Sequence, residues 1–185
     1  MSNPKDQFIL HEYSECFSHI RHYDNIWTTL GTFSVSLYTV VAAVCSVLIQ
    51  NGQAEFFISI ILILTFLAEI IIITMIAQNR SYFVATARQV NNIRGAFWEN
   101  IDFDSFLPLK PTTPKPVNLR STQLLVMFAL SFVNAIVLAL GGALLLETIL
   151  IVNPYLISVI LFFLALLLEI LVIYLILRNA GAPVN

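Results

Sequence analysis

Four long apolar runs, separated by short connections and by one longer polar segment, dominate the pattern of this chain. Each run is longer than twenty residues, and they cover residues 26–49, 56–77, 124–146 and 155–177. A helix needs about 20 apolar residues to cross the hydrocarbon core of a bilayer. The pattern therefore predicts an all-α membrane protein in which four transmembrane helices form two hairpins.

The second and fourth runs share a residue pattern. Each contains one carboxylate, Glu69 or Glu169, and both continue as E-I-[IL]-[IV]-I-x-x-I-x-x-N to Asn79 or Asn179. The matching positions are one hundred residues apart. We therefore predict two copies of one hairpin that run in the same direction and are related by an axis along the membrane normal.

The nine Lys and Arg residues are distributed unevenly along the chain. They precede the first run, lie between the second and third, or follow the fourth, whereas the connections 50–55 and 147–154 contain none. Positive charge favours the cytoplasmic side, so both termini and the central segment are expected there. The predicted divisions are a cytoplasmic amphipathic helix (1–25), a first transmembrane hairpin (26–78), a cytoplasmic helix with a Pro-rich linker (79–121), a second transmembrane hairpin (122–178) and a cytoplasmic tail (179–185).

Composition excludes several classes of protein. With 58% hydrophobic and only 11% charged residues, the chain differs from a soluble domain. The largely polar residues 1–25 have no apolar segment after a basic start, so no cleavable signal is expected. Cys16 and Cys45 are expected at different depths and unable to form a disulfide within one subunit. Basic and acidic residues are mixed on the cytoplasmic side, which does not suggest nucleic-acid binding.

Two polar segments are expected to form helices outside the membrane. Apolar residues recur at helical spacing before the first run, and Trp27 marks the interface. Residues 80–99 have an apolar stripe that can continue the second helix and pack on the N-terminal helix. Residues 100–121 are rich in proline and predict an extended linker.

All three histidines lie in the N-terminal segment. His11, Glu15, His19 and His22 follow a line along one face of the expected helix. A nearly straight line offers at most two or three ligands to one metal ion, and no HExxH motif fixes a site. We therefore predict no metal site, with His11, His19 and His22 as a weak alternative that a symmetric oligomer could complete; a proton sensor is another alternative.

Small and hydroxylated side chains form a stripe on the first run and a second stripe on the third. Such stripes mark faces where membrane helices pack closely or line water. We expect the first and third helices to form packed or pore-facing surfaces, and the second and fourth to face mainly lipid. The stripe residues are Thr28, Thr32, Ser36, Thr39, Ala43 and Ser46 on the first run and Ser131, Ala135, Ala139 and Gly142 on the third.

Glu69 and Glu169 lie roughly ten residues from one end of their runs, which places them about 15 Å deep. An acid at that depth is a functional candidate, because its ionised form must face a partner or water. Polar residues at similar depth are Asn134 on the third run and Tyr38 or Thr39 on the first. Two interpretations stay open: a neutral, hydrogen-bonded pair of structural acids, or a proton or ion pathway.

The layout resembles small bacterial multi-span membrane proteins, namely SLATT-type effectors and the octameric RipA family. The residues that carry this resemblance are Arg21, Asp24, Trp27, Arg88, Ile93, Arg94 and Phe97. The resemblance implies a homo-oligomer in the bacterial inner membrane that breaches or depolarises it when a cytoplasmic partner or signal triggers it. SLATT-type proteins are found beside nucleotide-signalling and antiphage genes, so the resemblance also implies a role in defence.

Three functional hypotheses follow. The first is an oligomeric effector or pore subunit; the second is a membrane anchor or sensor that recruits a soluble partner; the third is a small proton-coupled transporter that uses Glu69 and Glu169. No enzyme motif and no cofactor site is found. The expected partners are the lipid bilayer and further copies of the chain, with a cytoplasmic protein as a further candidate. Residues proposed to receive a trigger or an anionic ligand are Arg21, Asp24, Arg88, Asn92 and Arg94.

Overall fold

The computed structural model of the protein describes residues 4–51, 55–98, 115–149 and 153–179. They form four helices, which are α1 (Pro4–Gln50), α2 (Glu55–Trp98), α3 (Thr122–Ile149) and α4 (Pro154–Asn179). Each helix is long and apolar enough to cross a membrane. The predicted all-α class with four membrane-spanning helices is therefore confirmed at this level. Most of the expected Pro-rich linker lies outside the described residues.

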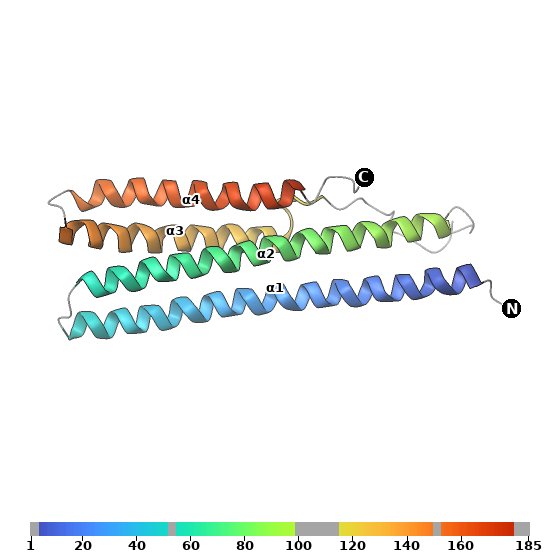
Figure 1. Ribbon diagram of the computed structural model, residues 1–185, viewed down its shortest axis with the longest axis horizontal. Coiled ribbons are helices and arrows are strands. Elements are labelled where there is room, and N and C mark those ends of the chain that lie inside the picture. The colour runs from blue at the N-terminus through green and yellow to red at the C-terminus, as the bar shows by residue number, and fades with distance from the viewer. Residues whose placement is uncertain (1–3, 52–54, 99–114, 150–152, 180–185) are drawn as a thin grey trace.

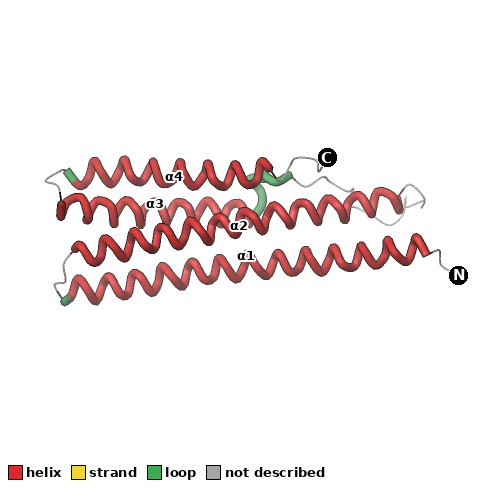
Figure 2. The backbone as a smooth tube through the Cα atoms, viewed as in Figure 1, coloured by secondary structure: helices red, strands yellow, loops and turns green. Residues whose placement is uncertain are grey.

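The helices form a four-helix bundle that continues into a two-helix stalk. At one end all four helices lie alongside one another, and at the other α1 and α2 continue together beyond α3 and α4 (Figures 1 and 2). We use "the stalk" for residues 4–24 of α1 with 82–98 of α2, and "the bundle" for the remaining parts of these helices with α3 and α4. Neither long helix is interrupted where stalk and bundle meet.

The start of α4 is determined by local sequence. Asn153 precedes the helix, and its side-chain oxygen accepts a hydrogen bond from the backbone N–H of Tyr155 at 3.1 Å. Pro154 follows as the first helical residue, where its missing N–H costs nothing. This capping pair begins the fourth helix directly after the turn that follows α3.

The centre of the bundle is occupied by α2, which contacts each of the other three helices. Within the most apolar window of each helix, 39% of α2 and 44% of α3 is buried, against 11% of α1 and 17% of α4. The expectation that the second helix faces mainly lipid was wrong for α2, whereas of the two helices expected to form packed or pore-facing surfaces only α3 is packed within the described part of the chain. Large side chains of α2 such as Phe66 and Ile76 are buried in the core of the bundle. They are buried because α2 has neighbouring helices on several sides, and the size of a side chain does not change this.

Two apolar layers form the core of the bundle. The layer nearer the stalk joins α2, α3 and α4, with Trp27, Leu30, Leu37 and Tyr38 of α1 packed against it. The layer nearer the short connections is built around Phe66, Ala135 and Ala165. Buried residues of the first layer are Ile72, Ile73, Ile76, Ala77, Leu124, Met127, Leu130, Ile173 and Leu177.

The stalk is held together by polar and aromatic contacts between α1 and α2. Arg94 donates from Nε to the Tyr13 hydroxyl at 3.0 Å, and its guanidinium lies over the rings of Tyr13 and Phe17. Gln89 donates to the Glu12 carboxylate at 2.6 Å. The expected packing of the two extramembrane helical segments on each other is therefore present.

The thiol of Cys16 is buried in the stalk, at 4% exposure. Burial, together with the nearby carboxylates of Glu12 and Glu15, raises the pKa of this thiol. Since the thiolate is the reactive form, we expect Cys16 to react with maleimide at least about tenfold more slowly than an exposed cysteine. Its rate should still rise with pH at values where the exposed thiol has reached its plateau.

A matched comparison is a Cys16→Ser, Ser18→Cys variant, because Ser18 is exposed on the same segment of α1. The second native cysteine, Cys45, is replaced by serine in both proteins. Equal alkylation rates at positions 16 and 18 would show that the stalk does not shield Cys16.

Candidate functional site

A layer of polar side chains separates the two apolar layers of the bundle, and all four helices contribute to it. Each of these residues is buried or half-buried. Phe66 and Ala165 lie about one turn before Glu69 and Glu169, and Ile73 and Ile173 lie one turn after them. We call this the polar layer, and it consists of Ser34 and Tyr38 on α1, Glu69 on α2, Ser131 and Asn134 on α3 and Glu169 on α4.

One strong hydrogen bond crosses the polar layer. The side-chain nitrogen of Asn134 donates to Oε1 of Glu169 at 2.6 Å and to the backbone carbonyl of Phe66 at 3.2 Å. Asn134 thereby joins α3 to both α4 and α2. Its amide is completely buried, so these bonds offset much of the cost of placing it in an apolar bundle.

Other atoms of the polar layer lack partners among the described residues. Glu69 faces the Ser34 hydroxyl, and Glu169 faces the Ser131 hydroxyl, but neither pair reaches the geometry of a hydrogen bond. Tyr38 lies close enough to interact electrostatically with both carboxyl groups. The unpartnered atoms are Ser34 Oγ, Tyr38 Oη, both carboxyl oxygens of Glu69, Ser131 Oγ, Asn134 Oδ1 and Glu169 Oε2.

A small pocket lies beside the polar layer between α2 and α4. It has a volume of about 60 Å³. This space is large enough for water or a small ion. The residues around it are Ile70, Ile73, Thr74, Leu168, Glu169 and Val172.

Of the intramembrane candidates, the structure brings Glu69, Glu169 and Asn134 together and leaves Thr39 out. Thr39 is exposed on the outer side of α1, where its hydroxyl donates to the carbonyl of Val35 at 2.8 Å. Thr39 is next to Tyr38 along α1, but its side chain faces away from the acids, so of the two alternatives on α1 Thr39 is not their partner. Tyr38, the alternative on α1, is the residue that reaches the layer.

The two hydroxyl and small-residue stripes have opposite environments. On α3, Ser131, Ala135 and Gly142 are buried in contacts within the chain. On α1 the stripe points away from the bundle, and its hydroxyls donate to backbone carbonyls of their own helix four residues earlier, at 2.8–2.9 Å. The exposed residues are Thr28, Thr32, Ser36, Thr39, Ala43 and Ser46. We call this set the outer stripe.

Sequence reasoning missed Ser34 and Ser131 as neighbours of the acids. Both are completely buried. A signal was present on α1, because Ser34 and Tyr38 are four residues apart and share one helical face. Ser131 was assigned only to the stripe of α3, although it lies one turn before Asn134.

The residues expected to receive a trigger do not form one site. Arg94 is bound to Tyr13 near the far end of the stalk, whereas Asp24 lies at its base. Arg21 and Asn92 are exposed, and Arg88 is half-buried. The arrangement suits a long contact surface better than one pocket for an anion.

A buried arginine that was read only as an interface marker connects three parts of the chain. Arg80, at 5% exposure, donates to the carbonyl of Pro116 at 2.9 Å, to Ser121 at 2.7 Å and to Gln123 at 3.0 Å. Gln123 in turn donates to Asp24 at 3.3 Å. This network joins the base of the stalk to the start of α3.

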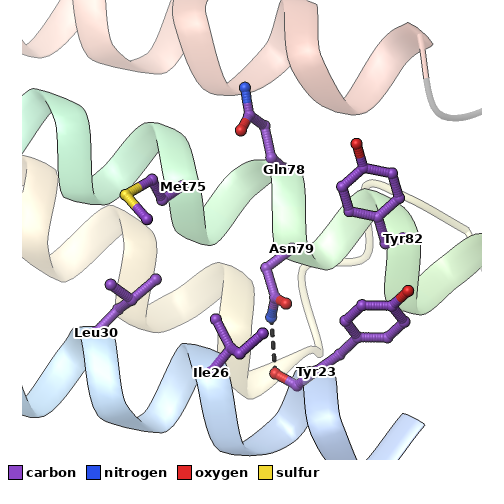
Figure 3. Close-up of a pocket in the computed structure, with 7 residues that line it drawn as sticks. All are labelled: Tyr23, Ile26, Leu30, Met75, Gln78, Asn79 and Tyr82. Atoms are coloured by element: carbon purple, nitrogen blue, oxygen red, sulfur yellow. Dashed lines mark hydrogen bonds between the residues drawn. The ribbon is translucent and has the colours of Figure 1, made fainter. Parts of the chain in front are cut away.

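A groove of about 330 Å³ lies between α1 and α2 where the stalk joins the bundle (Figure 3). Asn79, the last residue of the repeated pattern in α2, donates to the carbonyl of Tyr23 at 2.7 Å. The rings of Tyr23 and Tyr82 stack beside it, with centroids 6.1 Å apart. The side chain of Asn179, the matching residue of α4, lies outside the described part. Other residues around the groove are Ile26, Leu30, Met75 and Gln78.

The line of histidines lies on the exposed side of the stalk. His11, Glu15, His19 and His22 are all exposed, and His19 and His22 lie beside the ring of Tyr23. Among the described residues there is no group of three or more His, Cys, Asp or Glu side chains that could hold a metal ion.

Comparison of the chain with protein families, with curated proteins and with solved structures gave no match.

Proposed function

We propose that the protein is a subunit of an oligomeric membrane effector that perturbs the membrane when it is triggered from the cytoplasm. The proposed location is the bacterial inner membrane, with both termini in the cytoplasm. The observation that carries this proposal is the outer stripe of α1, which points away from the chain's own bundle. A role in antiphage defence rests only on the resemblance to SLATT-type proteins.

The outer stripe is suited to contact with another membrane helix. Its side chains are small, and its hydroxyls already have backbone partners. In lipid, small residues let helix backbones approach closely, which is the main source of favourable packing there. A second copy of the chain presents the same stripe, and repeated contacts of one kind close into a ring. The space bordered by α1 helices is the proposed path through the membrane.

The stalk is the proposed trigger. Because α1 is one helix from Pro4 to Gln50, a change at the stalk can rotate or shift the stripe without any intervening hinge. A cytoplasmic protein that binds the stalk would act on both α1 and α2, since their contacts run along its length. The anchor or sensor hypothesis shares this surface but needs no path across the membrane.

A second candidate is a proton-coupled transporter, and the polar layer favours it. Glu69 and Glu169 are both buried at the centre of the bundle, on two neighbouring helices. Ionisable residues inside a membrane commonly mark proton or ion pathways. This candidate requires the polar layer to bind a cation, whereas the effector does not.

The effector is tested first by cysteine cross-linking in membranes. In a Cys16→Ser, Cys45→Ser background, Ser36→Cys on the outer stripe should form a disulfide-linked dimer on mild oxidation. Leu167→Cys is the matched control, because Leu167 is 66% exposed on α4 but lies outside the stripe. Equal cross-linking at both positions would contradict a specific contact through α1.

The second readout is membrane potential, followed with a potential-sensitive dye during expression. We expect depolarisation that is lost in a Thr32→Leu, Ser36→Leu variant, because large side chains separate the helices, and kept in Leu167→Ala. Deletion of residues 4–20, which form most of the α1 part of the stalk, should change the extent of depolarisation. If the potential stays intact with the full chain and also after this deletion, the effector proposal is wrong.

A further inference from the structure

The unpartnered atoms of the polar layer are all oxygens. They come from two carboxyl groups, one amide and three hydroxyls, and all four helices contribute at least one. Buried polar atoms in proteins nearly always have partners. The Ser34 and Ser131 hydroxyls are turned toward Glu69 and Glu169, but Tyr38 Oη, one carboxyl oxygen of Glu69 and Asn134 Oδ1 still have no partner among the described residues, which indicates that a ligand belongs there.

The hydroxyl of Ser34 shows that the lack of a backbone partner is a feature of the polar layer and not of α1 as a whole. On the outer stripe, Ser36 and Thr39 donate to carbonyls of α1 at 2.9 and 2.8 Å. Ser34 has no such bond among the described residues, although it belongs to the same helix and is completely buried. Its hydroxyl instead faces the carboxyl group of Glu69.

The charge in the layer is entirely acidic. The titratable groups that face it are Tyr38 from α1, Glu69 from α2 and Glu169 from α4, and α3 contributes Ser131 and Asn134. Along α2 and α4 the nearest basic residues are Arg80 and Arg178, which are about 16 and 14 Å away at 1.5 Å per residue. An ionised carboxyl in such surroundings needs a positive charge close by.

We propose that the polar layer is a binding site for a small cation, either a proton or an alkali-metal ion, held between Glu69 and Glu169. Oxygen-only surroundings favour hard cations and disfavour transition metals, which prefer histidine or cysteine ligands. A proton would convert one carboxylate into a hydroxyl donor for one of the unpartnered oxygens. An alkali-metal ion would take the same oxygens as ligands.

The pocket beside Glu169 provides space for the cation or its water. It borders the carboxyl group on the α4 side and is walled by apolar residues of α2 and α4. The apolar layers above and below separate the polar layer from both ends of the bundle. The pocket itself opens sideways between α2 and α4, where Leu168 is exposed, and the site does not depend on the proposed oligomer.

The test uses the full chain in lipid nanodiscs with a choline-based buffer. Thermal unfolding is followed in acidic and alkaline buffers and, at alkaline pH, with sodium, lithium, potassium, magnesium or calcium at constant ionic strength. A ligand bound only by the folded state should raise the midpoint by about 3–6 °C for each tenfold increase above its dissociation constant. Glu69→Gln and Glu169→Gln should lose this shift, whereas Glu147→Gln, at an exposed position near the end of α3, should keep it.

The arms distinguish the two cations. A shift with an alkali-metal ion at fixed pH identifies a metal ion, and a shift with acid alone identifies a proton. Equal midpoints under all conditions, a response that persists in both glutamine variants, or a response only to divalent ions would overturn the proposal. The histidines of the stalk are present in every variant and therefore cannot account for a difference between them.

Infrared spectroscopy of the unmodified protein keeps the test decisive if the glutamine variants do not fold. A proton site predicts the carbonyl band of a protonated, buried carboxyl group that disappears at alkaline pH. A metal site predicts loss of that band, or a shift of the carboxylate bands, when sodium or lithium is added at fixed pH. Spectra that respond to neither would overturn the proposal.

Discussion

Replacement of Arg80 by methionine is expected to lower the free energy of unfolding by about 3 kcal/mol or more. The guanidinium makes three hydrogen bonds, to Pro116, Ser121 and Gln123, while itself being buried. Methionine matches the length of the side chain but donates nothing. The acceptors on Pro116, Ser121 and Gln123 remain in place and lose their donor. Removing the buried positive charge of Arg80 therefore does not compensate for the lost hydrogen bonds.

The measurement is unfolding in a denaturing detergent, with tryptophan fluorescence as the signal. Arg120→Met is the control, because Arg120 is exposed on the segment just before α3. Arg80→Lys should give an intermediate loss, since a single ammonium cannot match the fork of the guanidinium. If Arg80→Met and Arg120→Met were equally stable, the network would contribute nothing to the fold.

Arg80 also illustrates a limit of sequence reasoning. An arginine just beyond an apolar run is typical of a membrane interface. Its acceptors, however, lie about 40 residues further along, and only the return of the chain to α3 brings them to α2. No local pattern encodes that contact, so the bonds at the base of the stalk could not be predicted.

The acids of the polar layer could be predicted because the apolar background is so uniform. A carboxyl group inside a membrane helix has few possible partners, so Asn134 and Tyr38 were identified from depth alone. Ser34 was not, because serine can satisfy itself on its own helix and therefore occurs on either face. Ser34 is buried and Ser36 exposed, and only the packing of α1 on α2 decides between them.

The stripes show how one pattern can have two outcomes. Small residues at helical spacing predict packed or pore-facing surfaces on both α1 and α3. On α3, Ala135 and Gly142 are buried within the chain, whereas on α1 the outer stripe is exposed in the part of the chain that the structure describes. The pattern records that a close contact is possible, and the arrangement of the helices determines which of these contacts is intramolecular.

The glycines of the bundle provide the sharpest test of this packing, because one substitution should have opposite effects at two positions. A Cβ added at Gly141 would lie 2.8 Å from Cβ of Leu62 and 3.2 Å from the carbonyl oxygen of Ser59. Both atoms are fixed to the backbone of α2, so the helices must separate. Gly141→Ala is therefore expected to destabilise the bundle by about 2 kcal/mol or more.

The same change at Gly31 meets nothing within 4 Å. Gly31→Ala should be neutral or stabilise the protein by up to about 1 kcal/mol, because alanine is the better helix former. At Gly142 the added Cβ would contact only the side chain of Leu161, and the close contact is with Cδ1, the far end of that flexible side chain, so the expected loss lies between the other two. Detergent unfolding of the three variants should rank them Gly31, Gly142, Gly141 from most to least stable. A reversed order would mean that α2 and α3 do not approach each other this closely, and would also contradict the hydrogen bond from Asn134 of α3 to the Phe66 carbonyl of α2.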